Sequence, residues 1–251
     1  MTDEALEYPR IAERMRALLP RMVEIARRVP HEEQGILYSE ALFLVGCIDG
    51  RGVHRIVESG RARAQSTLLF SLMLPDTEIV SIELEETSPH APIAAERLRG
   101  RDNVRLLFGD SRELMPQLVQ RGDAIFIDGP KGFRSIRLAT ALLGAGQTDH
   151  VFVHDLTQGT DKRDFVARNF PEARFSDRRE LAAIGAEADR AGGVPVAWNG
   201  DANGDYGYGF GVGLIPRLGS RRYGWLNRKA GFRGAAVRLA ARIERTFRRK
   251  G

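Results

Sequence analysis

Two periods of apolar residues alternate along this chain, and they predict helices and strands in turn. In the first thirty residues apolar side chains recur at steps of three and four, which predicts an amphipathic helix that Pro30 ends. The apolar face of this helix comprises Ile11, Met15, Leu18, Leu19, Met22 and Ile25. A second short helix is predicted from Ser39 to Val45, with Ser39 as its N-cap.

Short apolar runs beyond residue 50 have the composition of β-strands. They cover residues 54–58, 78–82, 104–108, 124–127 and 150–153. Helical patterns separate these runs: one through residue 72, then 92–98, 111–119 and 134–143. This alternation predicts an α/β fold with a doubly wound, mostly parallel sheet and helices on both faces. Residues 191–213 are rich in glycine and predict a loop that leads into a strand over 208–214.

Length and composition favour a globular protein. A chain of 251 residues with 43% hydrophobic residues can bury enough surface to fold without a disulfide, and Cys47 has no second cysteine to pair with. The N-terminal sequence MTDEALEY is acidic, and no apolar run reaches the ~20 residues of a membrane span. We therefore expect a soluble, cytoplasmic protein.

The positive charge is concentrated at the C-terminus. Residues 217–251 hold 12 basic residues and the single acid Glu244, so the rest of the chain is net negative although the whole carries +5. Nucleic acid is therefore not the expected partner. The tail predicts a helix with one apolar face, formed by Phe232, Ala236, Leu239, Ile243 and Phe247. This helix could lie on an anionic membrane surface, but we favour one that docks on the body or on a second subunit.

Polar and acidic residues follow each of five predicted strands. They are Glu58–Gly60, Glu83, Gly109–Ser111, Asp128–Lys131 and His154–Asp155. In an open parallel sheet, ligands bind at the carboxyl ends of the strands. Only Gly60 stands in the first turn, which is too few glycines for a dinucleotide site. A carboxylate at Glu83 can accept both hydroxyls of a ribose, so a nucleoside without a pyrophosphate fits better.

Residues 53–156 resemble the class I S-adenosylmethionine-dependent methyltransferases, especially the catechol O-methyltransferase-like branch. Its E-x-G-x-x-x-G-x-S pattern is matched except that Ala64 replaces the second glycine. The resemblance implies a Rossmann-like, seven-stranded sheet, with extra N-terminal helices and a basic C-terminal helix in this chain. It also implies cofactor-binding roles for Glu58, Gly60, Ser66, Thr67, Glu83, Asp110, Ser111 and Asp128.

The motif FIDGPKG at 126–132 carries the most specific part of the resemblance. It implies that Asp128 ligates Mg²⁺ or another divalent cation and that Lys131 removes the proton of the acceptor hydroxyl. A second metal ligand is expected at Asp155. Leu156 stands where that branch has an amide ligand, which leaves the metal requirement open. His154 is an alternative base, or a ligand for a softer metal.

The block T-D-x-V-F-V-H-D at 148–155 also resembles the glucuronoxylan methyltransferase family. That resemblance favours a saccharide hydroxyl or carboxyl as the methyl acceptor. We expect the N-terminal helices, the loop 191–208 and the aromatic residues Trp198, Tyr206 and Tyr208 to face the acceptor. We expect residues 1–50 to form a helical cap, 51–216 the methyltransferase domain and 217–251 a basic tail, all within one compact domain.

The predicted function is an O-methyltransferase, assisted by a divalent metal, that acts on a small molecule or a saccharide. Two alternatives stay open. Ala64 and Leu156 favour a binding or scaffold protein that keeps the fold without catalysis. A metal-dependent hydroxylase on the same fold is the other. Two kinds of partner also stay open: a second copy of the chain in a homo-oligomer, and a membrane surface that the basic helix contacts peripherally.

Overall fold

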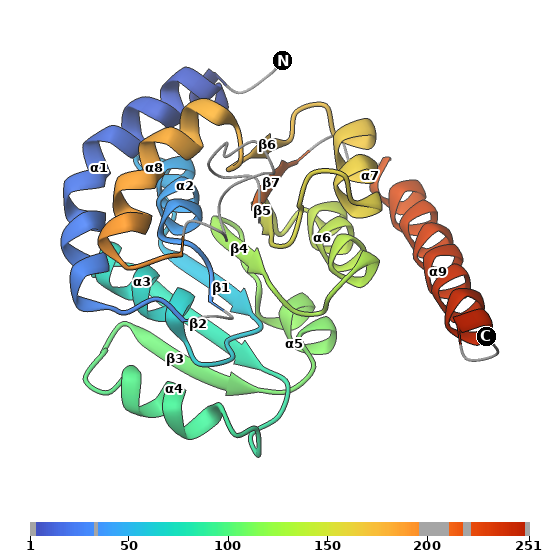
Figure 1. Cartoon of the computed structure of the whole chain (residues 1–251), viewed down its shortest axis with the longest axis horizontal. Coiled ribbons are helices and arrows are strands. Elements are labelled where there is room, and N and C mark those ends of the chain that lie inside the picture. The colour runs from blue at the N-terminus through green and yellow to red at the C-terminus, as the bar shows by residue number, and fades with distance from the viewer. Residues whose placement is uncertain (1–3, 33–34, 196–210, 218–221, 249–251) are drawn as a thin grey trace.

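A computed structural model of the chain describes residues 4–32, 35–195, 211–217 and 222–248, and these build an α/β sandwich (Figure 1). The sheet has the strand order β3-β2-β1-β4-β5-β7-β6. All pairs among β1 to β5 are parallel, and β7 runs antiparallel to both β5 and β6. The strands are β1 (Arg55–Ser59), β2 (Glu78–Glu83), β3 (Val104–Phe108), β4 (Asp123–Ile127), β5 (Thr148–Val153), β6 (Arg174–Phe175) and β7 (Gly213–Pro216).

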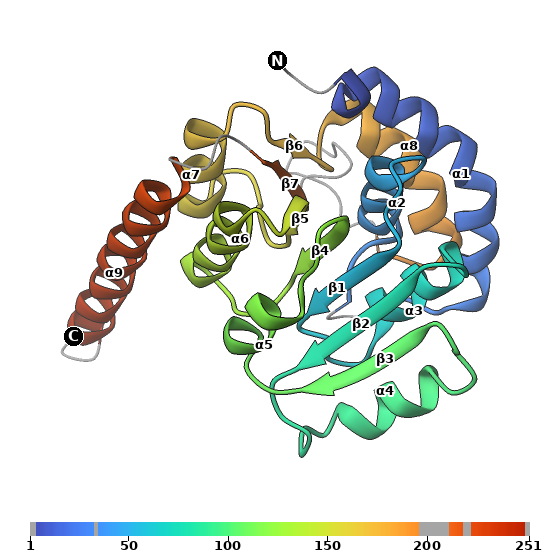
Figure 2. The same cartoon turned by 180° about the vertical axis from the view of Figure 1, so that it is seen from behind.

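Helices connect the strands and cover both faces of the sheet. After the 3₁₀ turn η1 (Glu4–Leu6) they are α1 (Tyr8–Arg28), α2 (Tyr38–Ile48), α3 (Gln65–Met73), α4 (Ala91–Arg97), α5 (Ser111–Leu118), α6 (Phe133–Ala145), α7 (Asp161–Asn169), α8 (Arg179–Ala191) and α9 (Tyr223–Arg248). Alternate residues of each strand enter opposite cores. Ile56, Phe126 and Phe152 pack with α1, α2, α3 and α8, whereas Val57, Ile125 and Val151 pack with α5, α6, α7 and α9. Figure 2 shows these two groups of helices on either side of the sheet.

The strand order reverses between β1 and β4. The chain winds outward through β1, β2 and β3 on one side and through β4 and β5 on the other, so β1 and β4 are neighbours without being consecutive. Their carboxyl ends meet where Ser59 pairs with Ile127. The loops after these two strands must diverge to opposite faces of the sheet, and this divergence opens a ligand crevice in folds of this kind.

The predicted fold class is confirmed, and most predicted elements lie within two residues of the observed ones. Ser39 is not the N-cap of α2. Leu37 occupies that position, and the Glu40 side chain accepts a hydrogen bond from its backbone N–H. The strand expected over 208–214 begins at Gly213, and residues 196–210 lie outside the described part of the chain. Helices α7 and α8 were not predicted.

The expected apolar face of the basic tail does not face the body. Helix α9 packs on α6 through Tyr223, Leu226 and Ala230, which are buried. Phe232 and Leu239 are instead 78% and 60% exposed. Glycines allow α9 and α6 to pack closely through this other face. A Cβ at Gly144 would lie 3.0 Å from Tyr223, and one at Gly234 would lie 2.8 Å from Phe133. None of the helices within the described ranges is long and apolar enough to span a membrane.

The contact between α2 and α8 offers a test of how the N-terminal helices are held. A Cβ at Gly185 would lie 2.8 Å from the Cα atom of Ser39, and backbone cannot yield as a side chain can. We therefore expect Gly185→Ala to lower the free energy of unfolding by about 1–3 kcal/mol in urea titrations. Gly224→Ala is the matched control, because nothing lies within 4 Å of its Cβ position. Equal stability of the two variants would contradict this packing.

Candidate active site

Four predicted catalytic or metal-binding side chains converge at the carboxyl ends of β4 and β5. Asp128 and Lys131 follow β4, and His154 and Asp155 follow β5. The Lys131 Nζ donates to Asp128 Oδ1 at 2.5 Å and to Asp155 Oδ2 at 3.0 Å. The His154 Nδ1 lies 2.8 Å from Asp128 Oδ1 and 3.2 Å from Asp155 Oδ1. Asp155 has a φ of 57°, a left-handed backbone conformation that few residues other than glycine adopt, with aspartate among those that do so most readily.

Glu40 of α2 completes this cluster, and no motif or spacing in the sequence predicted its role. Its Oε2 lies 3.2 Å from His154 Nε2, and the Glu40 side chain is only 2% exposed. The same carboxylate caps α2, because it accepts the Leu37 N–H at 2.9 Å. The imidazole of His154 is therefore held at both nitrogens, and its ring also meets the Phe126 ring edge-on. Only a contact between residues 114 positions apart reveals this role.

The charges in the cluster shift one another's protonation equilibria. Burial alone would lower the pKa of His154, but the Asp128 and Glu40 carboxylates raise it well above its ordinary value. Burial would likewise raise the pKa of Asp128, yet His154 and Lys131 bring it below the ordinary value. Lys131 follows the His154 pattern: desolvation lowers its pKa, the two carboxylates raise it, and the net pKa is raised. Lys131 and His154 are therefore both cationic at neutral pH in this arrangement.

Lys162 of α7 is a second lysine beside the cluster. Its side chain is 8% exposed, and its Nζ donates to the backbone carbonyl of His154 at 2.8 Å. Burial is the main cause that lowers the pKa of Lys162 to about 8, and the nearby charge of Lys131 lowers it further against the opposing effect of Asp155 and Asp128. Lys162 thus anchors the backbone of the turn after β5. The sequence did not predict a role for this lysine.

The loop after β1 is held from within by Glu58. This carboxylate is completely buried and accepts hydrogen bonds from the hydroxyls of Ser66, Thr67 and Ser81. Burial raises the pKa of Glu58, while these hydroxyls oppose the shift. Thr67 is also completely buried. Of the residues expected to bind cofactor, Glu58 and Thr67 are therefore buried within this loop, and neither lines the cavity described below.

The loops after β1 and β4 approach each other closely, which explains why glycine stands at position 60. A Cβ at Gly60, which has a φ of +88°, would lie 2.7 Å from the backbone N of Gly129. The loops after β1 and β4 therefore touch backbone to backbone, and only glycine fits. Ala64 stands at the second glycine of the resembled pattern and precedes α3 with a φ of 66° and a ψ of 31°, a left-handed conformation that glycine adopts more readily. The chain tolerates strain at that position.

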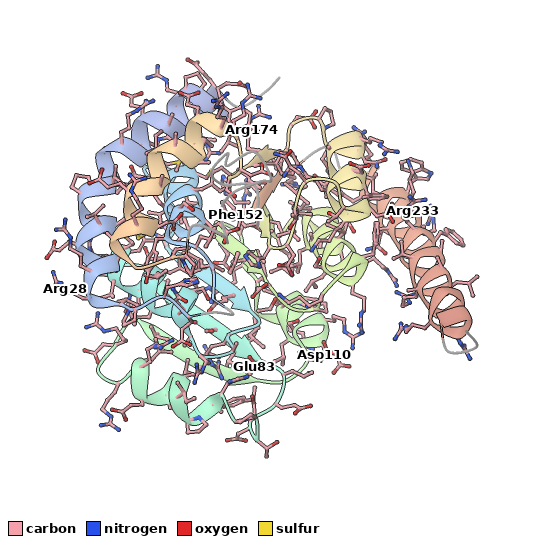
Figure 3. All side chains as sticks on the ribbon, viewed as in Figure 1. Arg28, Glu83, Asp110, Phe152, Arg174 and Arg233 are labelled. Carbon is pink, nitrogen blue, oxygen red and sulfur yellow. The ribbon has the colours of Figure 1, made fainter. Side chains whose placement is uncertain are left out.

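Glu83 and Asp110 lie at the ends of the neighbouring strands β2 and β3 (Figure 3). Glu83 Oε2 accepts the N–H of Ala62 at 2.7 Å and its Oε1 accepts that of Leu84 at 2.8 Å. Asp110 is the N-cap of α5 and accepts the Arg112 N–H at 2.9 Å, and its bonds to the Arg112 guanidinium lower its pKa. Ser111 Oγ points to the carbonyl of Gly129 at 3.4 Å. The loops after β1, β2, β3 and β4 are thus hydrogen-bonded together.

A narrow cavity of about 20 Å³ lies between the loop after β1 and the loop after β4, and its lining includes Gly60, Ser66 and Asp128. Glu32, Gly35 and Ile36 cover it. The Glu32 carboxylate forms ion pairs with Arg63 and Arg97, and the backbone N–H of Glu32 donates to Gln65 Oε1 at 2.8 Å. A nucleoside is larger than this cavity. Arg61 lies beneath, 2% exposed, with Nε and Nη2 unpaired among the described residues.

Three comparisons with known proteins were made. No family model matches the chain, and neither does any curated protein. Among solved structures, the O-methyltransferase TomG from Streptomyces achromogenes in complex with S-adenosylmethionine is 20% identical, with a TM-score of 0.45 over 79% of this chain and 89% of that chain. A Bacillus cereus O-methyltransferase bound to S-adenosylhomocysteine is 15% identical, with a TM-score of 0.45 over 80% and 90% of the two chains. At these identities and TM-scores the likeness supports no conclusion about this chain.

The lowered pKa of Lys162 predicts a specific pH dependence of stability. The unfolded chain binds this proton up to the ordinary lysine pKa of about 10.4, whereas the folded protein releases it near 8. Stability must therefore rise with pH across that window, because the unfolded state binds more protons there. We expect wild type to gain about 1 kcal/mol relative to Lys162→Met between about pH 8 and pH 9.5 in urea unfolding.

Lys229→Met, at an exposed lysine of α9, is the control for loss of a positive charge. It should keep the slope of the wild type in the same measurement. Parallel pH profiles of wild type and Lys162→Met would contradict the buried environment described for Lys162.

Proposed function

We propose that the protein is an S-adenosylmethionine-dependent O-methyltransferase that acts on a small-molecule or saccharide acceptor. The observation that carries the proposal is the junction of two sets of residues at one crevice. Gly60, Glu83 and Ser111 lie on loops that suit a nucleoside bearing a carboxylate, and Asp128 joins them to the charged cluster of Lys131 and His154. A methyl donor and an acceptor oxygen would meet at that junction.

The reaction itself requires little covalent chemistry from the protein. The acceptor oxygen attacks the methyl carbon, the carbon–sulfur bond of the sulfonium breaks, and its electron pair stays on sulfur. The acceptor proton must leave, because a neutral hydroxyl is a poor nucleophile. Positioning and proton removal are therefore the tasks left to the side chains.

Lys131 is the proposed base, and its surroundings set a condition on that role. With Asp128 and Asp155 both bonded to it, the raised pKa of Lys131 keeps it protonated at neutral pH. In this state the ammonium can orient an acceptor oxygen but cannot take its proton. Lys131 can act as a base only if a further positive charge interacts with the same two carboxylates and so lowers the pKa of Lys131. His154, held by Asp128 and Glu40, is fixed in orientation and already cationic, which favours a positioning role for it.

The donor set fits a divalent cation, provided that the cation displaces the proton that His154 Nδ1 shares with Asp128. Asp128, His154 and Asp155 then offer ligand atoms that lie within 4.8 Å of one another. Two carboxylates and one imidazole suit a transition-metal dication better than Mg²⁺, which prefers oxygen ligands throughout. The completely buried Leu156 supplies no amide oxygen to change that balance. Such a cation would supply the charge that lowers the pKa of an acceptor hydroxyl.

The test is methyl transfer followed by mass spectrometry, with a uronic-acid oligosaccharide and a catechol as probes. The wild type should add one methyl group and release S-adenosylhomocysteine, and Asp128→Ala and Lys131→Ala should each lower the rate by about 10²–10⁴-fold. Asp164→Ala, which removes an exposed aspartate from α7, is the matched control. Chelation with EDTA and addition of Mn²⁺ or Mg²⁺ test the metal.

Three outcomes would count against the proposal. Full activity of both cluster variants would remove the acid–base role of Asp128 and Lys131. A product that gains one oxygen atom would assign the site to hydroxylation. An enzyme insensitive to chelation, with cluster variants inactive, would keep the lysine mechanism and remove the metal.

A further inference from the structure

Helix α9 presents an apolar stripe to solvent on the side opposite its packing face. Trp225, Phe232 and Leu239 are 51%, 78% and 60% exposed and recur every seven residues. At 3.6 residues per turn this spacing places them in one line along the helix. The residues that contact α6 lie about half a turn away, so the fold does not use this stripe. Among the described residues, only Leu84 and Phe108 are other exposed large hydrophobic side chains.

Basic residues flank the stripe. The sequence from Tyr223 to Arg248 holds seven arginines and lysines and one acid. Arg228 lies between Trp225 and Phe232 along the stripe, and Lys229 lies 4.6 Å over the Trp225 ring. Arg233, labelled in Figure 3, borders the stripe and pairs with Asp161 of α7. The exposed surface of the helix is thus apolar along its centre and positive along its edges.

The helix also extends beyond the element that supports it. It runs antiparallel to α6, because Tyr223 lies at Gly144 near the end of α6 and Gly234 lies at Phe133 at its start. The 14 residues that follow Gly234, up to Arg248, continue for about 21 Å past that point. Figures 1 and 2 both show this end standing off from the sheet. Since α6 begins after the loop that carries Lys131, α9 extends toward the active-site side.

We propose that α9 is an interfacial helix that binds the surface of an anionic lipid bilayer. Apolar side chains along one face enter the boundary between headgroups and acyl chains, and flanking arginines and lysines bind anionic headgroups. Long basic side chains can reach the headgroups while their stems cover apolar surface. Charge argues against a second copy as the occupant. Two α9 helices paired through this stripe would bring two strongly positive surfaces together, with Arg228 between them.

Vesicle binding of the full chain tests this assignment. Trp198→Phe leaves Trp225 as the only tryptophan, so its fluorescence reports the stripe directly. We expect a blue shift and co-sedimentation with phosphatidylcholine vesicles that contain phosphatidylserine, and little of either with phosphatidylcholine alone. Added salt should weaken the binding.

Variants separate the apolar and charged contributions. Phe232→Ser with Leu239→Ser should lower the partition coefficient by about tenfold or more, because these side chains lose their transfer to the lipid. Arg228→Gln should lower it about fivefold. Leu84→Ser is the matched control, because Leu84 is as exposed as Leu239, at 60%, but lies after β2. Thermal unfolding by circular dichroism verifies that each variant is folded.

The proposal is overturned if anionic and neutral vesicles bind equally, if neither binds, or if the double serine variant binds as the wild type does. A concentration-dependent dimer without lipid, abolished by the same double variant in sedimentation analysis, would assign the stripe to a second copy of the chain. Activity need not be measured for any of these outcomes, so they are independent of the proposed methyl transfer.

Discussion

Asp128 is the point on which the geometry of the crevice depends. Its carboxylate binds Lys131 and His154 at once, and its backbone N–H donates to the Ser59 carbonyl at 2.9 Å. These bonds tie the end of β4 to the ends of β1 and β5. Gly60 permits the contact because any side chain there would strike the backbone at residues 128–129. A shared carboxylate at a topological switch point thus couples the loop proposed for the cofactor to the groups proposed for catalysis.

The N-terminal helices do more than cover the sheet. Glu40 reaches His154 from α2, and Glu32, between α1 and α2, closes the crevice through Arg63 and Arg97. The N–H of Ser39, at the start of α2, is bound by the buried Asp189 of α8 at 2.9 Å. Position and protonation of the cluster therefore depend on elements outside the parallel strands. The residues beside the crevice and the carboxylate that orients His154 thus belong to the same N-terminal helical segment.

Periodicity was enough to predict the parallel strands and the helices between them, because strand ends coincide with changes in apolar spacing. It was also enough to place Asp128, Lys131, His154 and Asp155 at neighbouring strand ends. It could not reveal Glu40, whose pattern is that of a helix residue and whose partner is far along the chain. Periodicity predicted the wrong packing face for α9, because it selects the most apolar side chains, Phe232 and Leu239. The helix packs instead through small residues such as Ala230 and Gly234, which allow close contact with α6.

Calorimetric titration with S-adenosylmethionine tests the central claim most directly, with Glu83→Ala and Glu85→Ala as a matched pair. Glu83 bonds to the first loop, and Glu85 is an exposed glutamate two positions away. The account predicts micromolar binding by the wild type, about tenfold to hundredfold weaker binding by Glu83→Ala, and wild-type binding by Glu85→Ala. No heat of binding from the folded wild type would contradict the methyltransferase assignment and favour a scaffold that keeps the fold without the cofactor.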